Sequence, residues 1–182
     1  MEQPGFDPGD FYEFDLARGA VRTRSGARVL VLSDGVVRQL VSAALHKGDL
    51  TALRDLGQEL GGQARASLGA GVVDLPPEVV LGHASGYFAL FGFGRIRLDS
   101  WGDALVASVD GAPQLDGDCH ALGALLGGLF SSLAGRELAC VPIGPDAQFM
   151  LVEPAVALDV QQWAKQGADV ATVATRLVPR PA

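Results

Sequence analysis

Apolar and polar positions along the chain follow two periods, and stretches of the two kinds succeed one another. Alternation of apolar and polar residues, or a short β-branched apolar run, is typical of a strand, whereas apolar spacing of three and four is typical of a helix. These patterns predict strands at residues 11–16, 20–23, 27–32, 95–98, 104–109, 137–141 and 148–152. They predict helices at residues 34–47, 50–68, 76–92, 119–134 and 159–177.

The order of these elements defines the expected fold class. Strand pairs joined by short turns are separated by helices, which is typical of an α+β domain. We therefore expect an α+β fold with an antiparallel sheet and helices packed on one side. The length of 182 residues agrees with a single domain, since domains average about 150 residues.

Glycines occur inside two of the predicted helices. Gly57, Gly61 and Gly62 lie in the second helix, although each glycine costs about 1 kcal/mol relative to alanine. This predicts close packing against a neighbour. Gly123 and Gly127 are four residues apart and share one face of a later helix. That face packs either against the glycine-bearing second helix or against a second copy as a dimer seam.

Composition narrows the functional classes. A hydrophobic fraction of 48% excludes a disordered chain, and a charged fraction of 19% indicates a surface partly covered by a partner. The net charge of -7 argues against nucleic-acid binding. The sequence contains no run of 18 apolar residues, so no membrane span is predicted. The acidic N-terminus lacks the basic start of a secretory signal. With two cysteines and no C-x-x-C pair, we expect a cytoplasmic protein.

Four arginines between acidic stretches are the one basic cluster. They form either a solvated hairpin face or a binding patch for an acidic partner. The four are Arg18, Arg22, Arg24 and Arg28.

Residues for catalysis or metal binding are sparse. The three histidines have no metal-ligand spacing, so no metal and no cofactor are predicted. Cys119 lies at a predicted helix start. It is either a packing residue or a reactive thiol whose pKa the helix dipole lowers. An enzyme using Cys119 or Cys140 is disfavoured because no base stands beside either thiol in the sequence.

An apolar set around the middle of the chain is the candidate ligand site. Such residues are core by default, but they can also line a small apolar pocket between the helices and the sheet. The candidate lining residues are Phe88, Phe91, Trp101, Leu126 and Phe130.

Four segments resemble a known family. They are GAVRTRSGARVLVLS at residues 19–33, LGQELGGQARASLG at 56–69, LFGFGRIRLDSWGDALVASV at 90–109 and CHALGALLGGLFSSLAGRELACVPIG at 119–144. Together they resemble the 4-vinyl reductase-type small-molecule-binding domain, which shares its fold with TRAPP vesicle-tethering subunits and is similar to haem–nitric oxide sensor domains. The resemblance covers residues 11–155. It leaves a flexible lead at 1–10 and a C-terminal helix and tail at 156–182.

The resemblance implies an apolar ligand cavity and dimerisation, and it does not imply reductase activity. Family members carry a further cysteine just before the Phe of the last strand, where this chain has Ala147-Gln148-Phe149. A site of three thiols is therefore not expected here.

Two functional hypotheses follow. The first is a non-catalytic ligand-binding or regulatory adaptor module that forms a homodimer, binds an apolar small molecule and can engage a protein partner. The alternative is a structural assembly subunit without a ligand. The acidic, glycine-rich helix pair with a Trp-Gly hairpin is also similar to the small D subunit of bacterial cellulose synthase, which is such a scaffold.

Overall fold

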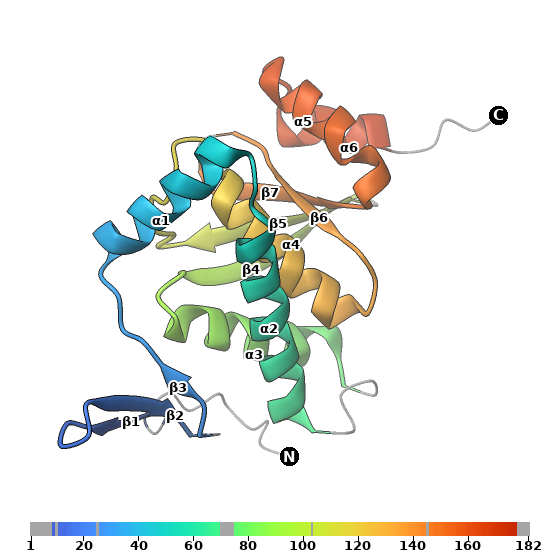
Figure 1. Cartoon of the computed structure of the whole chain (residues 1–182). Coiled ribbons are helices and arrows are strands. Elements are labelled where there is room, and N and C mark those ends of the chain that lie inside the picture. Colours follow the sequence, from blue (N-terminus) through green and yellow to red (C-terminus); the bar gives the residue numbers. More distant parts are fainter. Residues whose placement is uncertain are drawn as a thin grey trace.

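The computed structural model describes residues 9, 11–24, 26–69, 75–102, 104–144 and 146–177. The predicted lead at 1–10 lies outside the described residues apart from Gly9, and so does the end of the tail after Leu177. Two antiparallel sheets and several helices make up the described part (Figure 1).

The main sheet has four strands that come from two hairpins. β4 (Arg95–Trp101) pairs with β5 (Ala104–Asp110), and β6 (Ala139–Pro142) pairs with β7 (Gln148–Val152). β5 and β7 join the hairpins, so the order is β4-β5-β7-β6. Both hairpins were predicted, and β4 and β6 are the sheet edges.

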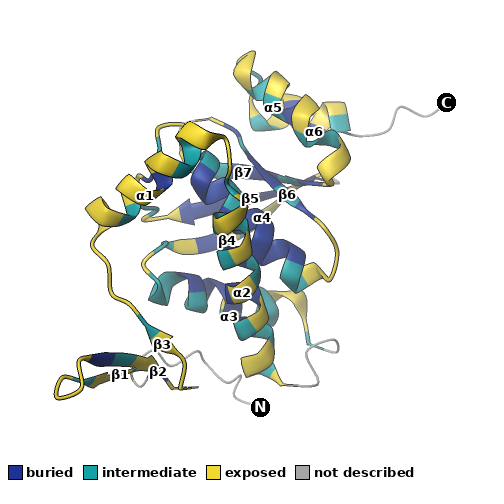
Figure 2. Cartoon of the chain, viewed as in Figure 1, coloured by how far each residue is buried: buried dark blue, intermediate teal, exposed yellow. Residues whose placement is uncertain are grey.

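One face of the sheet packs against the most buried helix. α4 (His120–Ala134) is apolar over most of its surface and is buried along most of its length, as Figure 2 shows. An all-round apolar helix belongs in the interior. α2 (Thr51–Leu68) lies across α4, and α3 (Pro77–Leu90) leads through a short turn into β4. The shared core includes Phe88, Leu125, Leu126 and Phe149.

The helices α2 and α4 contact each other at glycine residues. A Cβ at Gly57 of α2 would lie 1.9 Å from the carbonyl oxygen of Leu125, and a Cβ at Gly128 of α4 would lie 1.9 Å from the carbonyl oxygen of Arg54. The two backbones are therefore in direct contact, which only glycine permits at these positions. The close packing expected from the glycines of the second helix is confirmed.

The opposite face of the sheet is covered by the C-terminal helices. A 3₁₀ turn (Pro154–Val156) leads into α5 (Ala157–Lys165) and then α6 (Val170–Leu177). Val160 and Val173 are fully buried in a cluster with Met150 of β7 and other residues of the sheet. The α+β class with an antiparallel sheet is confirmed, and the structure adds helices on the second face. The single helix expected at 159–177 is interrupted, and Gly167 there has φ +85°.

The N-terminal segment forms a small separate sheet. β1 (Tyr12–Asp15), β2 (Ala20–Thr23) and β3 (Arg28–Val29) pair antiparallel in that order. Aromatic side chains attach it to α3: the ring of Phe11 packs edge-on against Tyr87 and Phe91 at 5.2 and 6.2 Å between centroids.

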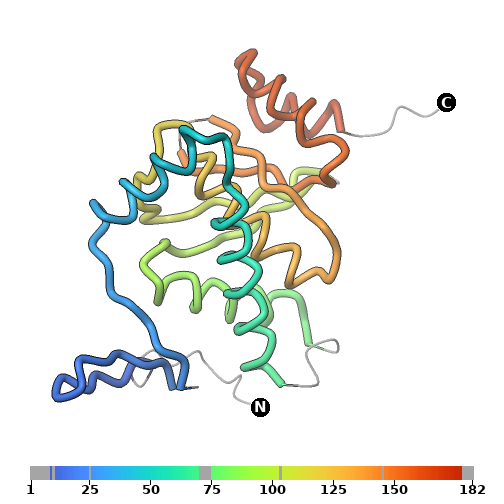
Figure 3. Tube along the Cα trace, in the orientation of Figure 1, coloured from blue at the N-terminus to red at the C-terminus, as the bar shows by residue number. Residues whose placement is uncertain are grey.

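An extended connector, residues 30–33, runs from this sheet to α1 (Asp34–Lys47) (Figure 3). The strand predicted at 27–32 is therefore paired only at Arg28 and Val29. α1 packs on the main body through Val41, which contacts a cluster with Leu115 and Ala121.

Candidate functional site

A recess of about 1110 Å³ lies between α3 and the edge strand β4. We call it the α3/β4 groove. One face of α3 forms a wall, with residues at helical spacing, and β4 forms the facing wall. The lining residues are Glu78, Leu81, Gly82, Ser85, Gly86, Ala89, Leu90, Arg95, Ile96, Arg97, Leu98, Asp99 and Asp110.

Small side chains on α3 create the space. Gly82, Ser85 and Ala89 are spaced by three and four and share one helix face. The side chains that α3 presents toward β4 on this face are therefore small. A Cβ at Gly82 would meet no atom within 4 Å. This side of the groove is therefore open to a ligand.

One serine joins the two walls. The Ser85 hydroxyl accepts a hydrogen bond from the Ile96 backbone N–H at 2.9 Å and donates one to the Ile96 carbonyl at 3.1 Å. Ser85 thereby satisfies two backbone groups of an edge strand, which would otherwise be available to another chain. The two hydrogen bonds fix the position of α3 relative to β4 at this point.

Charges are arranged along the groove. Arg97 forms an ion pair with Asp110 at 2.8 Å. Arg95 forms no ion pair within the described part of the chain, and it lies at the end of the groove near Leu90. Asp99 is four residues further along the strand, about 13 Å away at roughly 3.3 Å per residue. The groove therefore combines apolar side chains with five charged ones, and Asp110 lies directly opposite Arg95 in the ladder of β4 and β5.

The sequence-predicted pocket residues are divided between the core and the surface. Phe88 and Leu126 are fully buried in the core, and Phe130 is buried beside them. Phe91 packs against the aromatic residues of the N-terminal sheet, and Trp101 is 47% exposed at the end of β4. None of the five lines the α3/β4 groove, although Phe88 shares a core cluster with Ile96 of its wall.

Cys119 precedes α4 in a left-handed conformation with φ +57°. Burial raises the pKa of its thiol, and Asp116 raises it further. This direction is opposite to the one that a reactive thiol at a helix start requires. The Asp116 carboxylate accepts hydrogen bonds from the backbone N–H groups of His120 and Ala121 at 2.8 and 3.2 Å, so it caps α4.

Cys140 is buried in β6, and burial raises the pKa of its thiol strongly. It also borders a smaller recess of about 290 Å³ between the start of α4, β6 and α5. A buried neutral thiol is a packing group rather than a nucleophile.

Gly123 and Gly127 face the same chain. A Cβ at Gly123 would lie 2.7 Å from the carbonyl oxygen of Cys140, and a Cβ at Gly127 would lie 2.9 Å from Nη1 of Arg54. Their helix face is therefore occupied within the chain, by β6 and the Arg54 side chain. Gly127 thus meets the side chain of an α2 residue, whereas Gly128 makes the backbone-to-backbone contact with α2.

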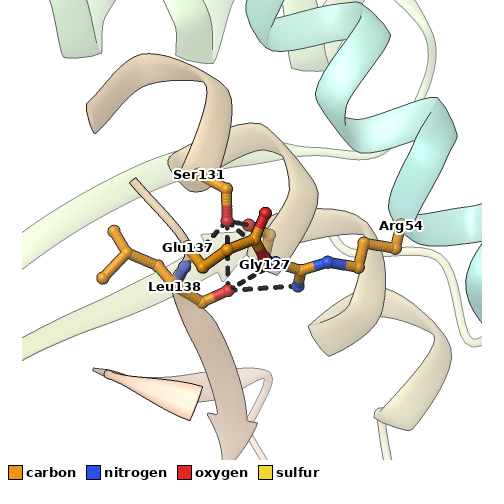
Figure 4. Close-up of polar contacts among 5 residues, drawn as sticks. All are labelled: Arg54, Gly127, Ser131, Glu137 and Leu138. Carbon is orange, nitrogen blue, oxygen red and sulfur yellow. Dashed lines mark hydrogen bonds and ion pairs between the residues drawn. The ribbon is translucent and has the colours of Figure 1, made fainter. Parts of the chain in front are cut away.

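A polar network around Arg54 was not anticipated from the sequence (Figure 4). The guanidinium donates to the Leu138 carbonyl at 3.1 Å and to the Ser131 hydroxyl at 3.0 Å, and it forms an ion pair with Glu137. Ser131 donates to the Gly127 carbonyl at 2.6 Å and accepts from the Leu138 N–H at 2.9 Å. The groups bind one another, so the network ties α2 to α4 and to the start of β6. No sequence signal marks it, because Arg54 and its partners are 77 to 84 residues apart.

Two further observations concern the described residues only. They contain no cluster of three or more His, Cys, Asp or Glu side chains arranged to hold a metal ion. None of the helices described has the length and apolarity that a membrane crossing requires.

Comparison with known proteins gives a structural match only. No protein-family model matches the chain, and no curated protein matches it. Among solved structures, the crystal structure of the phenol-responsive sensory domain of the transcription activator PoxR with phenol is similar, with a TM-score of 0.60. The match covers 94% of this chain and 93% of that domain. The chain shares the fold of this sensory domain. At 11% sequence identity, the likeness concerns the fold alone.

Proposed function

We propose that this chain is a non-catalytic regulatory module of the cytoplasm that binds an apolar small molecule and self-associates. Two observations support the proposal. The chain shares its fold with a sensory domain solved with phenol, and it carries an open groove beside its core.

The α3/β4 groove is the main support for the proposed binding of a small molecule. Its apolar side chains, such as Leu81, Leu90 and Leu98, can cover a hydrocarbon or aromatic body, and Arg95 can donate hydrogen bonds to a hydroxyl or acidic group. Specific pockets combine apolar side chains with placed polar groups, and this groove has five charged side chains beside its apolar ones. A volume near 1110 Å³ leaves room for molecules larger than one ring.

The interior set predicted from the sequence is the second candidate position. A ligand there would contact Phe88, Leu126 and Phe130, which pack against each other in the core. Binding would require these side chains to separate, with loss of packing of the kind that costs several kcal/mol in cavity-forming variants. A preformed groove avoids that cost, so we place the ligand in the groove.

The experiment uses the whole chain. Native mass spectrometry of freshly purified protein first tests for a retained molecule. Thermal unfolding is then measured with phenol, methylphenols and medium-chain fatty acids. A ligand at about 100 times its dissociation constant stabilises by about 2.7 kcal/mol, or about 5–10 °C for a domain of this size.

Gly82→Phe tests the position of the site. The added ring meets open space in the groove, so the fold is retained and the thermal shift is lost. Gly35→Phe is the matched control, because Gly35 also has open space around it but lies on α1. A shift that persists in Gly82→Phe would move the ligand to the interior position. A clean mass with no shift from any probe would refute the ligand-binding function.

A structural assembly subunit without a ligand is the second candidate function. The exposed apolar side chains at the N-terminal end, such as Phe14 and Leu30, favour it, because such surfaces are usually covered by another chain. This function is supported if no probe binds and the protein assembles through these residues.

A further inference from the structure

Most of the large exposed apolar side chains lie in one part of the chain. They occur on the small N-terminal sheet, the connector and the outer face of α1. These residues are Phe14, Leu16, Leu30, Val31, Leu32, Val36 and Leu40. Figure 2 shows the connector exposed as it runs from β3 to α1. Within the connector, the exposed fractions are 78% for Leu30, 75% for Val31 and 49% for Leu32.

The connector has the sequence of a strand, but no strand among the described residues pairs with it. Residues 27–32 form a β-branched apolar run, and strand pairing stops at Val29. β3 is also the outer strand of its sheet, since the order is β1-β2-β3. An apolar edge strand of this kind is a template for pairing with another chain.

The ladder shows which backbone groups are available. The Thr23 N–H donates to the Ala27 carbonyl at 2.8 Å. Hydrogen-bonded pairs alternate along an antiparallel ladder, so Val21 and Val29 form the next bonded pair. The backbone groups of Arg28 and Leu30 then point to the outer edge, and continuation of the strand places those of Leu32 there too.

We propose that the β3 edge and the connector pair antiparallel with the same segment of a second copy, about a two-fold axis at Leu30. This deepens the self-association part of the proposed function and rests on it. In this register Leu30 faces itself, Arg28 lies opposite Leu32 of the second copy, and Val29 lies opposite its Val31. The outward-facing backbone groups pair, and no two arginines lie directly opposite each other.

Side-chain rows support a second copy rather than an unrelated partner. Phe14, Val21 and Val29 already form one row across the N-terminal sheet. The proposed register adds Val31 of the second copy to that row, and symmetry adds the equivalent row on the other side. A two-fold interface requires such self-complementarity. The exposed apolar residues Val36 and Leu40 belong to α1, the helix that follows the connector, and would extend the contact toward the ~800 Å² per partner of a stable interface.

The position on the two-fold axis allows a charge-swap test. Leu30→Glu and Leu30→Lys each place like charges opposite each other, so each variant alone is expected to be monomeric in light scattering, with self-association weakened more than tenfold. A mixture of the two is expected to form a heterodimer, seen by its intermediate mass in native mass spectrometry. Leu158→Glu is the matched control, because Leu158 is 77% exposed on α5 and lies outside the proposed interface.

The outcomes distinguish the proposed interface from self-association as such. A monomeric wild-type protein would overturn both this interface and the proposed self-association, and it would leave ligand binding standing. A dimer that survives in Leu30→Glu would overturn the interface alone. Two monomeric variants that give no heterodimer on mixing would also overturn it. A folded circular-dichroism spectrum for each variant is part of the measurement.

Discussion

The close contact where α2 crosses α4 allows a quantitative prediction. Gly57→Ala would place a Cβ 1.9 Å from the carbonyl oxygen of Leu125, and ordinary contact begins near 3.4 Å. The two backbones must therefore move apart by about 1.5 Å at that point. Both atoms belong to packed helices, so a side-chain rotation cannot relieve the overlap.

The cost follows from what the separation disturbs. Alanine gains about 1 kcal/mol of helix propensity over glycine. Overpacking in a core costs about 1–3 kcal/mol, and moving α2 also loosens Leu60 and Leu129 at the same crossing. With the propensity gain subtracted from the overpacking cost, we expect Gly57→Ala to lower the free energy of unfolding by up to about 2 kcal/mol, out of a typical total of about 5–15 kcal/mol.

A second glycine of the same helix is the control. A Cβ at Gly62 would have its nearest neighbour, the Ser132 hydroxyl, at 3.9 Å. Gly62→Ala should therefore raise the free energy of unfolding by up to about 1 kcal/mol. Chemical denaturation followed by circular dichroism measures both variants. Equal stabilisation by Gly57→Ala and Gly62→Ala would refute the close crossing.

Three further predictions follow from single sites. Arg54→Met should destabilise by about 2–4 kcal/mol in chemical denaturation, because it removes the ties to Leu138 and Ser131, whereas Arg38→Ala at an exposed ion pair should change stability by less than about 0.5 kcal/mol. Ala147→Gly should raise the melting temperature, since Ala147 has φ +48° and glycine relieves about 1 kcal/mol of strain. Alkylation of Cys119 should be slower in the folded than in the unfolded protein at pH 7–9, because burial raises the pKa of the thiol; equal rates would contradict this.

The thiol pKa values also give a sign for stability against pH. A thiol whose pKa is higher in the folded state favours folding below its unfolded value, which is near 9.0. As pH rises above that value, the unfolded state loses its proton first and becomes more favourable. We expect this contribution of Cys119 and Cys140 to decline above pH 9 and to be constant below about pH 8.

The position of the candidate site could not be predicted from the pattern of apolar residues alone. Phe88, Leu126 and Phe130 were singled out by apolar character, but periodicity does not distinguish a filled core from a ligand pocket. The groove instead arises where small residues of α3 stand beside β4. Its exposed Arg95 and its Ser85–Ile96 hydrogen bonds depend on how these two elements meet.

The sequence by itself determined most of the elements and the class of fold. Local signals suffice for these, chiefly the period at which apolar residues recur in each segment. The two hairpins of the main sheet follow from alternating runs separated by short turns. These are interactions between residues close in the sequence, so they can be read from it.

Tertiary structure decided the rest. It determined that Gly128 rather than Gly123 meets α2, that α5 and α6 cover the second face of the sheet, and that the run at 27–32 finds a partner only at its first residues. Each of these depends on which distant segments share space. Close backbone approach, burial and the pKa of a thiol are set by such neighbours, and spacing along the chain does not specify them.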